Sequence, residues 1–449
     1  MIAVLIIFIS SCKKDNKGPT EDSDVNLGGE TTTNVSFINT FQIPASNLSA
    51  TELDLHRAGD KAFADIFVTA PNIVNQGLGP IFNQNACENC HVANGRSPFP
   101  SSTSDLRGLL FRLSVPGINI HNGPVAVPGF GGQLQTKATF NVQAEAKISW
   151  QEIEDIQQYL DGEKYALRHF VFTFENPYIA MPANVMVSPR IAPPIIGLGL
   201  LEAISEQEIL SFADPNDSNG DGISGKANYV WNTKEQKMML GRFGWKANEP
   251  TLLQQTADAY NNDMGITSPY NPIENFFDQS QYDKLADDPE IDQATLLAAT
   301  FYTQSLAVPR RRNWEDSEVR NGKFLFSKLK CDACHRPGFT TAQHPEYAFL
   351  SNQSIFPYTD MLLHDMGDGL ADNRPDYEAT GNEWRTPPLW GIGLTKIVGG
   401  HTNFLHDGRA RSLEEAILWH GGEAENSKEA FRKLNKTDRA AVVKFLESL

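Results

Sequence analysis

The sequence predicts a mainly α-helical protein built from two similar domains, the first of which carries a β-rich insertion. Three features predict this: a Cys-x-x-Cys-His motif that occurs twice, a second block repeated in the same order, and a β-prone stretch between the copies. The chain has 449 residues, 40% of them hydrophobic and 21% charged, which is enough for two or three domains with their own cores.

The N-terminal segment is apolar up to residue 12 and ends in small residues and Cys12. It is far shorter than the roughly 20 residues needed to span a bilayer, so it predicts a signal peptide, residues 1–12. Its ending resembles a bacterial lipobox, in which the cysteine is lipidated. This predicts a lipoprotein of the cell envelope that faces the periplasm, held by its lipid alone on the inner or outer membrane. The alternative is a buried strand with a chance cysteine. The polar residues 13–45 predict a flexible tether.

The order of the remaining segments predicts two domains. Residues 46–308 form the first, with an insertion at about 105–180 where the stretches 109–115, 137–148 and 170–174 are β-prone. The Pro-Arg-Arg-Arg-Asn run at 309–313 precedes the second unit, residues 309–449. Phe82 and Phe326 each stand five residues before a motif, and the block 193–200 matches 387–394, with Arg190 and Arg385 before them. Two copies of one plan, the first with a long insertion, explain this order.

The two motifs are Cys87-Glu88-Asn89-Cys90-His91 and Cys331-Asp332-Ala333-Cys334-His335. Two thiols at this spacing can add to the two vinyl groups of one haem while the histidine binds the iron. A single Cys-x-x-Cys also fits a redox dithiol or half a zinc site. Two copies, each followed by His, in a chain whose fifth cysteine takes lipid predict two covalent haem c groups in two cytochrome-c-like domains. Covalent haem attachment occurs outside the bacterial cytoplasm, in agreement with export.

His420 is the best candidate for a further iron ligand. Ser412 and Glu415 resemble the capping box of a helix start. Gly421 and Gly422 are typical of a helix C-terminus. His420 falls on the apolar face of this helix, with Leu413, Ala416 and Ile417. The alternative is a histidine stabilised by the negative end of the helix dipole.

Asp217, Asn219 and Asp221 are spaced like the first oxygen ligands of an EF-hand loop. Residue 12 of that loop is Asn228 instead of an acid, so the stretch is not an EF-hand. A calcium site and a plain Asx/Gly turn are about equally well supported.

Residues 87–96, 190–204, 217–231, 240–247, 358–372 and 383–423 resemble the bacterial di-haem oxidoreductase family, also described as peroxidases or thiol oxidoreductases. The resemblance extends from about residue 50 to the end. This family is similar to di-haem cytochrome c peroxidases, in which the helix matching 412–420 supplies a methionine to the second iron. His420 in that position implies a bis-histidine haem of lower potential. The peroxidases also hold calcium between their domains, though not through a loop like 217–221.

The resemblance implies that electrons enter at the second haem and pass to the first, where hydrogen peroxide or a similar small oxidant is reduced. Such chemistry needs an acid or base near an open iron site, and Glu202 is the candidate. The alternative is that Glu202 is an ordinary acid at the start of a helix. Trp245, Trp384 and Trp390 are candidate electron bridges or ordinary core aromatics. The net charge of −17 argues against nucleic acid and suits a small redox partner, a cytochrome or cupredoxin-like donor. The alternatives are a pure electron-transfer cytochrome and an accessory lipoprotein in iron or haem handling.

Overall fold

The computed structural model describes residues 23–35 and 37–449. Its α-helices are α1 (Ala50–Ala64), α2 (Cys87–Cys90), α3 (Leu198–Glu202), α4 (Glu206–Leu210), α5 (Leu252–Met264), α6 (Gln293–Ser305), α7 (Ser317–Lys328), α8 (Thr395–Gly399), α9 (Leu413–Leu418), α10 (Glu425–Arg432) and α11 (Lys436–Ser448). Short 3-10 turns include η4 (Cys331–Ala333) and η6 (Ile392–Leu394). Side chains cap several helix starts, because the first backbone N–H groups of a helix have no partner within it; Ser49 and Glu52 form a capping box at α1.

The strands form several small antiparallel sheets. They are β1 (Ile81–Phe82), β2 (Leu109–Ile118), β3 (Pro124–Val125), β4 (Lys137–Ala138), β5 (Lys147–Gln158), β6 (Lys164–Glu175), β7 (Met186–Ile191), β8 (Tyr229–Asn232), β9 (Lys237–Leu240), β10 (Phe339–Thr340), β11 (Ser354–Ile355), β12 (Leu363–Asp365) and β13 (Glu383–Arg385). The largest sheet has three strands in the order β3-β2-β7, and β5 pairs with β6 along its whole length.

The prediction of a mainly α-helical protein is wrong. The structure is 28% helical and 19% strand, with several small sheets. The β-prone stretches were recognised, since β2 and β6 contain residues 109–115 and 170–174. Their share was underestimated because the strands of 10 and 12 residues extend well beyond those stretches. Irregular segments also connect the helices around both motifs, where cytochrome-like helices were expected.

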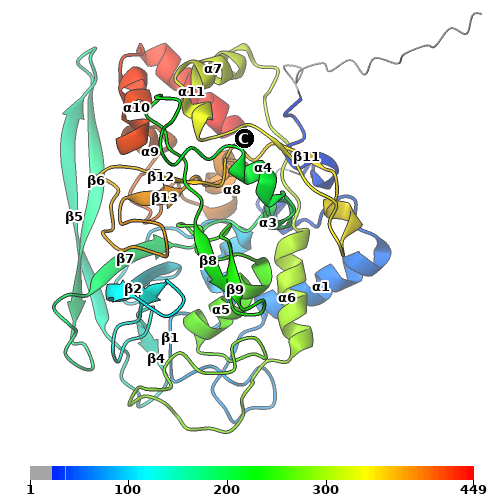
Figure 1. Cartoon of the computed structure of the whole chain (residues 1–449), viewed down its shortest axis with the longest axis vertical. Helices are drawn as coiled ribbons and strands as arrows, with labels where there is room; N and C mark the ends of the chain where they lie inside the picture. Colours follow the sequence, from blue (N-terminus) through cyan, green and yellow to red (C-terminus); the bar gives the residue numbers. More distant parts are fainter. Residues whose placement is uncertain (1–22, 36) are drawn as a thin grey trace, which may run out of the picture.

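Two helix pairs repeat one arrangement at opposite parts of the molecule. α1 crosses α6, and α7 crosses α11; Figure 1 shows the second pair at the top and the first at the lower right. Each crossing depends on a glycine: a Cβ on Gly59 would lie 2.2 Å from the carbonyl oxygen of Ala298, and one on Gly322 would lie 1.9 Å from that of Ala441. Only a residue without a side chain permits such close backbone contact.

The internal repeat extends to the aromatic residue beside each motif. The rings of Phe63 on α1 and His91 are 6.2 Å apart, and so are those of Phe326 on α7 and His335. The sequence had paired Phe326 with Phe82, but Phe82 lies in β1. Phe63 stands four residues after Gly59, as Phe326 stands four after Gly322, so the two helices share a Gly-x-x-x-Phe pattern.

The long β5–β6 hairpin, in the first half of the chain, contacts the second half through hydrogen bonds and ion pairs. It runs along one side of the molecule beside α9 and α10 (Figure 1). The Tyr159 hydroxyl donates to Glu414 at 2.8 Å, and the Arg168 backbone N–H donates to Glu415 at 2.8 Å. Arg439 of α11 pairs with Asp161 in the hairpin turn at 2.9 Å. The insertion therefore packs against the second helix pair.

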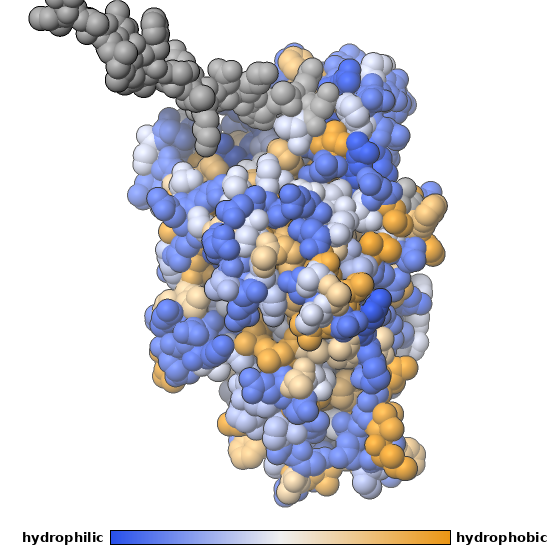
Figure 2. Space-filling model, turned by 90° about the vertical axis from the view of Figure 1, so that its right-hand side faces the viewer, coloured by the Kyte–Doolittle hydropathy of each residue, from blue (hydrophilic) through white to orange (hydrophobic). Residues whose placement is uncertain are grey.

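Residues 23–35 and 37–45 pack against the second half, where the composition predicted a flexible tether. Asp24 is 2% exposed and accepts two hydrogen bonds from Arg311 at 2.8 Å, and Lys323 donates to it at 2.9 Å. Phe41 lies in the largest apolar cluster. The molecular surface is otherwise mostly hydrophilic on the face in Figure 2, with apolar side chains scattered over it.

Candidate functional site

The first Cys-x-x-Cys-His motif lines a cavity. Cys87 and Cys90 stand at the two ends of α2, and His91 follows directly. The His91 Nδ1 lies 2.8 Å from the carbonyl oxygen of Pro193, in the block that repeats at 387. The cavity places both sulfurs and the imidazole of the motif on a common wall.

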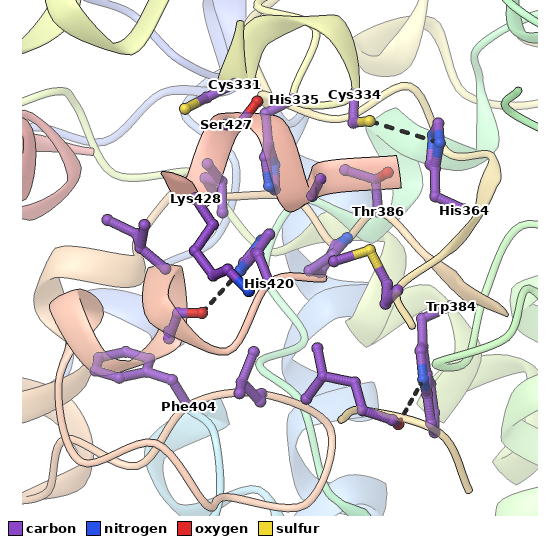
Figure 3. A pocket seen from close by; sticks show the side chains of 18 of the residues that line it. Cys331, Cys334, His335, His364, Trp384, Thr386, Phe404, His420, Ser427 and Lys428 are labelled. Carbon is purple, nitrogen blue, oxygen red and sulfur yellow. Dashed lines mark hydrogen bonds between the residues drawn. The ribbon is translucent and has the colours of Figure 1, made fainter. Parts of the chain in front are cut away.

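The second motif lines a separate cavity. Cys331, Cys334 and His335 lie on one side of it, and the His335 Nδ1 lies 3.1 Å from the Tyr358 carbonyl oxygen. His420 lies on the opposite side, and Figure 3 shows its ring and that of His335 turned toward one another. Ser412 caps the helix before it, as predicted, while α9 ends at Leu418, two residues earlier than His420.

The three candidate iron ligands share one hydrogen-bonding pattern. His420 Nδ1 lies 2.7 Å from the Ala416 carbonyl oxygen, so each ring holds Nδ1 toward a backbone carbonyl and leaves Nε2 for a metal. Burial lowers the pKa of His91 and of His335 to about 4 and also lowers that of His420. A neutral imidazole keeps the lone pair that a metal requires.

The distance between His335 and His420 fits a metal bound by both. Their ring centroids are 6.5 Å apart. A first-row metal binds an imidazole nitrogen at about 2.0–2.1 Å, and the nitrogen lies about 1.1 Å from the ring centre, so two rings on one metal stand roughly 6.3 Å apart. The residues therefore fit an iron held from both sides.

Arg96 and Arg385 supply positive charge that fits the carboxylates of a haem. They are 8% and 9% exposed and line both cavities. Arg96 donates to the Leu405 carbonyl, and Arg385 donates to those of Gly244 and Thr386. Within the described chain neither forms an ion pair with a carboxylate. Burial lowers the pKa of both to about 10. A buried charge needs a partner, which the haem propionates would supply.

Trp245 separates the two cavities. It lines both, is 7% exposed, and its indole N–H donates to the Ile191 carbonyl at 2.8 Å. The guanidinium of Arg96 lies 5.2 Å from its ring centre. Of the other candidate bridges, Trp384 lines only the second cavity, where it stacks on His406 at 3.8 Å. Trp390 is buried in the core and lines neither.

The first cavity contains three acids that the sequence analysis missed, of which Glu249 is buried and the other two are half-buried. Glu249, Asp258 and Asp263 all line it, beside Arg112. Burial, and then the neighbouring Asp258, raise the pKa of Glu249 well above its usual value; burial also raises that of Asp258, and that of Asp263 to about 6. Their spacing shows no pattern. The one available signal was that Glu249 follows the stretch 240–247, which carries the family resemblance.

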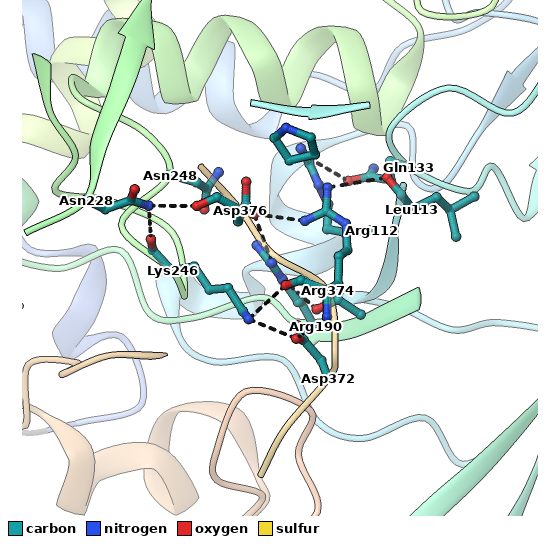
Figure 4. A network of polar contacts seen from close by, with 12 residues as sticks. Arg112, Leu113, Gln133, Arg190, Asn228, Lys246, Asn248, Asp372, Arg374 and Asp376 are labelled. Carbon is teal, nitrogen blue, oxygen red and sulfur yellow. Dashed lines mark hydrogen bonds and ion pairs between the residues drawn. The ribbon is translucent and has the colours of Figure 1, made fainter. Parts of the chain in front are cut away.

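A buried network of charges supports this wall of the first cavity (Figure 4). Arg190 of β7 and Arg374 each lie 3.0 Å from Asp376, which joins the insertion to the second half. Lys246, 0% exposed at its side chain, lies 2.8 Å from Asp372. Each of these buried charges has an opposite charge beside it, in contrast to Arg96 and Arg385.

Glu202 lies outside both cavities. Its carboxylate accepts the Leu252 backbone N–H at 2.8 Å and the Gln304 side-chain amide at 2.7 Å. It thus connects the first turn of α5 to α6. The catalytic role expected for it stays a prediction.

The loop 217–221 satisfies its own backbone. The side chains of Asp217, Asn219 and Asp221 accept N–H groups from Gly222, Asp221 and Ile223. The bonds of Asn219 and Asp221, each to the N–H two residues further on, are those of Asx turns, while Asp217 reaches the N–H five residues further on. The side-chain oxygens expected to bind calcium are thus already hydrogen-bonded within the loop. Calcium binding here stays a prediction.

The other interpretations of the motifs fit the structure poorly. Among the residues described, the two sulfurs and the imidazole of a motif do not converge as a zinc site requires. Burial raises the pKa of Cys87 and of Cys331 to about 12, which disfavours the reactive thiolate. Cys334 does approach Asp360 and His364. However, His364 lies between Asp360, at 2.8 Å, and Glu423, at 2.6 Å, so neither ring nitrogen is left for a metal.

Cys12 and the predicted signal segment lie outside the described residues. In the part of the chain that is described, none of the helices has the length and apolar character that a bilayer crossing requires.

One comparison with known proteins agrees with the two cavities. The family model described as "Di-haem oxidoreductase, putative peroxidase" matches residues 22–449. Among solved structures, a hydrazine synthase from Kuenenia stuttgartiensis is similar over 100% of both chains, with 13% identity and a TM-score of 0.39, which is too low to support an argument. The curated proteins include no match.

Proposed function

Because the chain belongs to the di-haem oxidoreductase family, we propose that it is an exported c-type di-haem enzyme that reduces hydrogen peroxide or a similar small oxidant. Electrons enter at the second site from a small cytochrome or cupredoxin-like donor and pass to the first. One observation carries this proposal: His420 faces His335 across the second cavity, whereas the first cavity has three acids and no histidine besides His91 among its described lining residues.

The haem groups supply the one-electron chemistry that side chains lack. Cys87 and Cys90 attach one haem and Cys331 and Cys334 the other, with His91 and His335 as the iron ligands. His420 completes the second site. Arg96 and Arg385 bind the propionates and hold both groups in place, since both guanidiniums lie between the cavities without a carboxylate partner.

Glu249 and Asp258 handle protons in the first cavity. The pKa values of these two neighbouring carboxyls are both raised, so the two cannot both ionise easily, and one keeps its proton while the other accepts one. The Glu249 Oε2 is buried without a hydrogen-bond partner in the described structure. Reduction of a peroxide consumes protons at the oxygen that leaves, and this pair lines the cavity into which they would be delivered.

Trp245 borders both sites. It is the one tryptophan among the three candidates that lines both cavities. A large aromatic side chain packed between two redox groups shortens the gap that an electron must cross. This supports electron transfer between the two sites within one chain.

Export follows from the motifs and the N-terminal segment together. We propose a periplasm-facing lipoprotein anchored through Cys12. Replacement of Cys12 by serine should release the protein in soluble form, because stable anchoring requires the lipid. Retention of that variant in salt-washed membranes would contradict the proposal.

Electron paramagnetic resonance of the oxidised protein tests the assignment of the two sites. One low-spin signal from His335/His420 is expected, with a second haem that binds cyanide. Turnover of hydrogen peroxide with a reduced small cytochrome should accompany it. Two low-spin haems that bind no cyanide would instead indicate an electron carrier, with Met264, which lines the first cavity, as the first thioether to examine.

A further inference from the structure

Three acidic side chains outside both haem cavities converge in the segment between α5 and α6. One carboxylate oxygen from each of Glu274, Asp288 and Glu290 lies within 4.8 Å of the other two. Like charges at this separation repel one another. No lysine or arginine of the described chain forms an ion pair with any of the three. The cluster therefore lacks positive charge.

Glu274 points its carboxylate into this cluster without a partner. The residue is 7% exposed, and its Oε2 is fully buried with no hydrogen bond within the described structure. A buried carboxylate oxygen without a donor is costly. Burial, followed by the surrounding acids, raises the pKa of Glu274 to about 8, and burial raises that of Glu290 to about 7. Both pKa values are raised, which shows that no positive charge of the described residues compensates the negative charge of the cluster.

Thr267 adds a further oxygen to the cluster. Its hydroxyl lies 2.7 Å from Asp288 Oδ1 and 2.5 Å from Glu290 Oε2, while its backbone N–H donates to the same Glu290 oxygen at 2.6 Å. A hydroxyl has one proton, so it can donate to only one of the two carboxylates. Its lone pairs remain for a cation.

We propose that Glu274, Asp288, Glu290 and Thr267 form a calcium site. Calcium takes six to eight oxygen ligands at about 2.3–2.6 Å in flexible arrangements, and water completes such a set. Asp288 is exposed, so the site has an open side for entry and for water ligands. Magnesium demands near-ideal octahedral geometry, which fits less well a set drawn from one long loop.

The position of the site suggests what the ion does. The segment 266–291 has no helix or strand of its own. Phe276, 0% exposed, packs against Gly79 and Gly265, and the Gly79 N–H donates to the Met264 carbonyl at 3.0 Å. The Asn83 N–H donates to the Asp263 carbonyl at 2.8 Å. The ion thus fixes a loop that contacts both α5 and the chain leading to Cys87.

Calcium binding to the holoprotein tests the site. After treatment with a chelator and desalting, titration calorimetry with Ca²⁺ should show one ion per chain. Asp288→Asn and Glu274→Gln should each weaken binding by at least about tenfold, since affinity follows ligand charge. The paired variant Asp217→Asn/Asp221→Asn should bind like the wild type. Absence of binding up to about 1 mM Ca²⁺, loss of binding only in the paired variant, or equal affinity for Mg²⁺ would overturn the assignment.

Limited proteolysis of the wild type provides a readout that needs no variant. Calcium should protect the segment 266–291 from cleavage, and the chelator should expose it, with the fragments mapped by mass spectrometry. Cleavage that is unchanged by calcium would contradict the site. Haem absorbance before and after each step verifies that the protein remains folded.

Discussion

The two cavities share one frame and differ in what faces the motif histidine. Around each, a helix with a Gly-x-x-x-Phe pattern crosses a second helix and places phenylalanine 6.2 Å from the histidine. In the second cavity a histidine ring lies opposite at 6.5 Å; in the first, Glu249 and Asp258 line the wall.

This difference is what the proposed function rests on. Two imidazoles on one iron would favour electron transfer, because no position is left for a substrate. Acids beside an iron with one protein ligand would favour chemistry that consumes protons. On this proposal, the shared frame holds both haems, and a few side chains outside it decide what each haem does.

The largest expected effect is at Glu249. Glu249→Gln removes the proton-handling group from the first cavity while it keeps the side-chain shape, so the rate of peroxide reduction should fall by about 10²–10⁴-fold. Glu202→Gln is the matched control and should retain nearly wild-type turnover, since Glu202 lines neither cavity. The reverse ranking in steady-state assays would restore Glu202 as the catalytic acid.

The second prediction concerns His420, whose replacement removes the main difference between the two cavities. His420→Ala should open the second site, convert its haem from low to high spin, and allow it to bind cyanide. His420→Met should raise its potential and introduce a thioether-to-iron charge-transfer band. Redox titration and absorbance measure both. If His420→Ala leaves both haem spectra unchanged, His420 is not a ligand and the remaining candidates are Met366 and His406, which line the same cavity.

The third prediction tests whether the two helix crossings, α1 with α6 and α7 with α11, contribute equally to stability. Gly59→Ala and Gly322→Ala each place a methyl group against a backbone carbonyl, at 2.2 Å and 1.9 Å. Overpacking of this kind should lower the unfolding free energy by about 1–3 kcal/mol. Gly132→Ala is the control, because a Cβ there meets nothing within 4 Å. Urea unfolding of the holoprotein gives the values; a cost at one glycine alone would mean that the two crossings differ in strength.

The smallest effect concerns a buried acid found in the first half. Burial raises the pKa of Glu145 to about 8, although the Gln135 N–H and the Gln279 side chain lower it. The protonated form is favoured in the folded state, so its contribution to stability is full below about pH 4.5 and is lost as pH rises toward 8. Glu145→Gln should therefore flatten the fall in melting temperature between pH 5 and pH 8. Parallel curves for the two proteins would show that Glu145 does not titrate there.

Local sequence sufficed for the features that depend on few neighbouring residues. Two thiols and a histidine at fixed spacing, found twice, predicted two haem groups, and the match of residues 22–449 to a di-haem family agrees with haem as the cofactor. Ser412 capped its helix as predicted, and His420 lies opposite His335. The repeated blocks also indicated two copies of one plan, although Phe82 was paired in place of Phe63.

Features that depend on contacts between distant segments were decided only by the tertiary structure. The fold class was wrong because long strands and irregular segments, rather than helices, surround the motifs. Glu249, Asp258 and Asp263 meet in one cavity although no spacing marks them, and Glu202 lies outside it. Glu274 and Glu290 converge only because one long loop folds back on itself. Covalent chemistry is encoded in adjacent residues, whereas burial and electrostatics arise from residues that folding brings together.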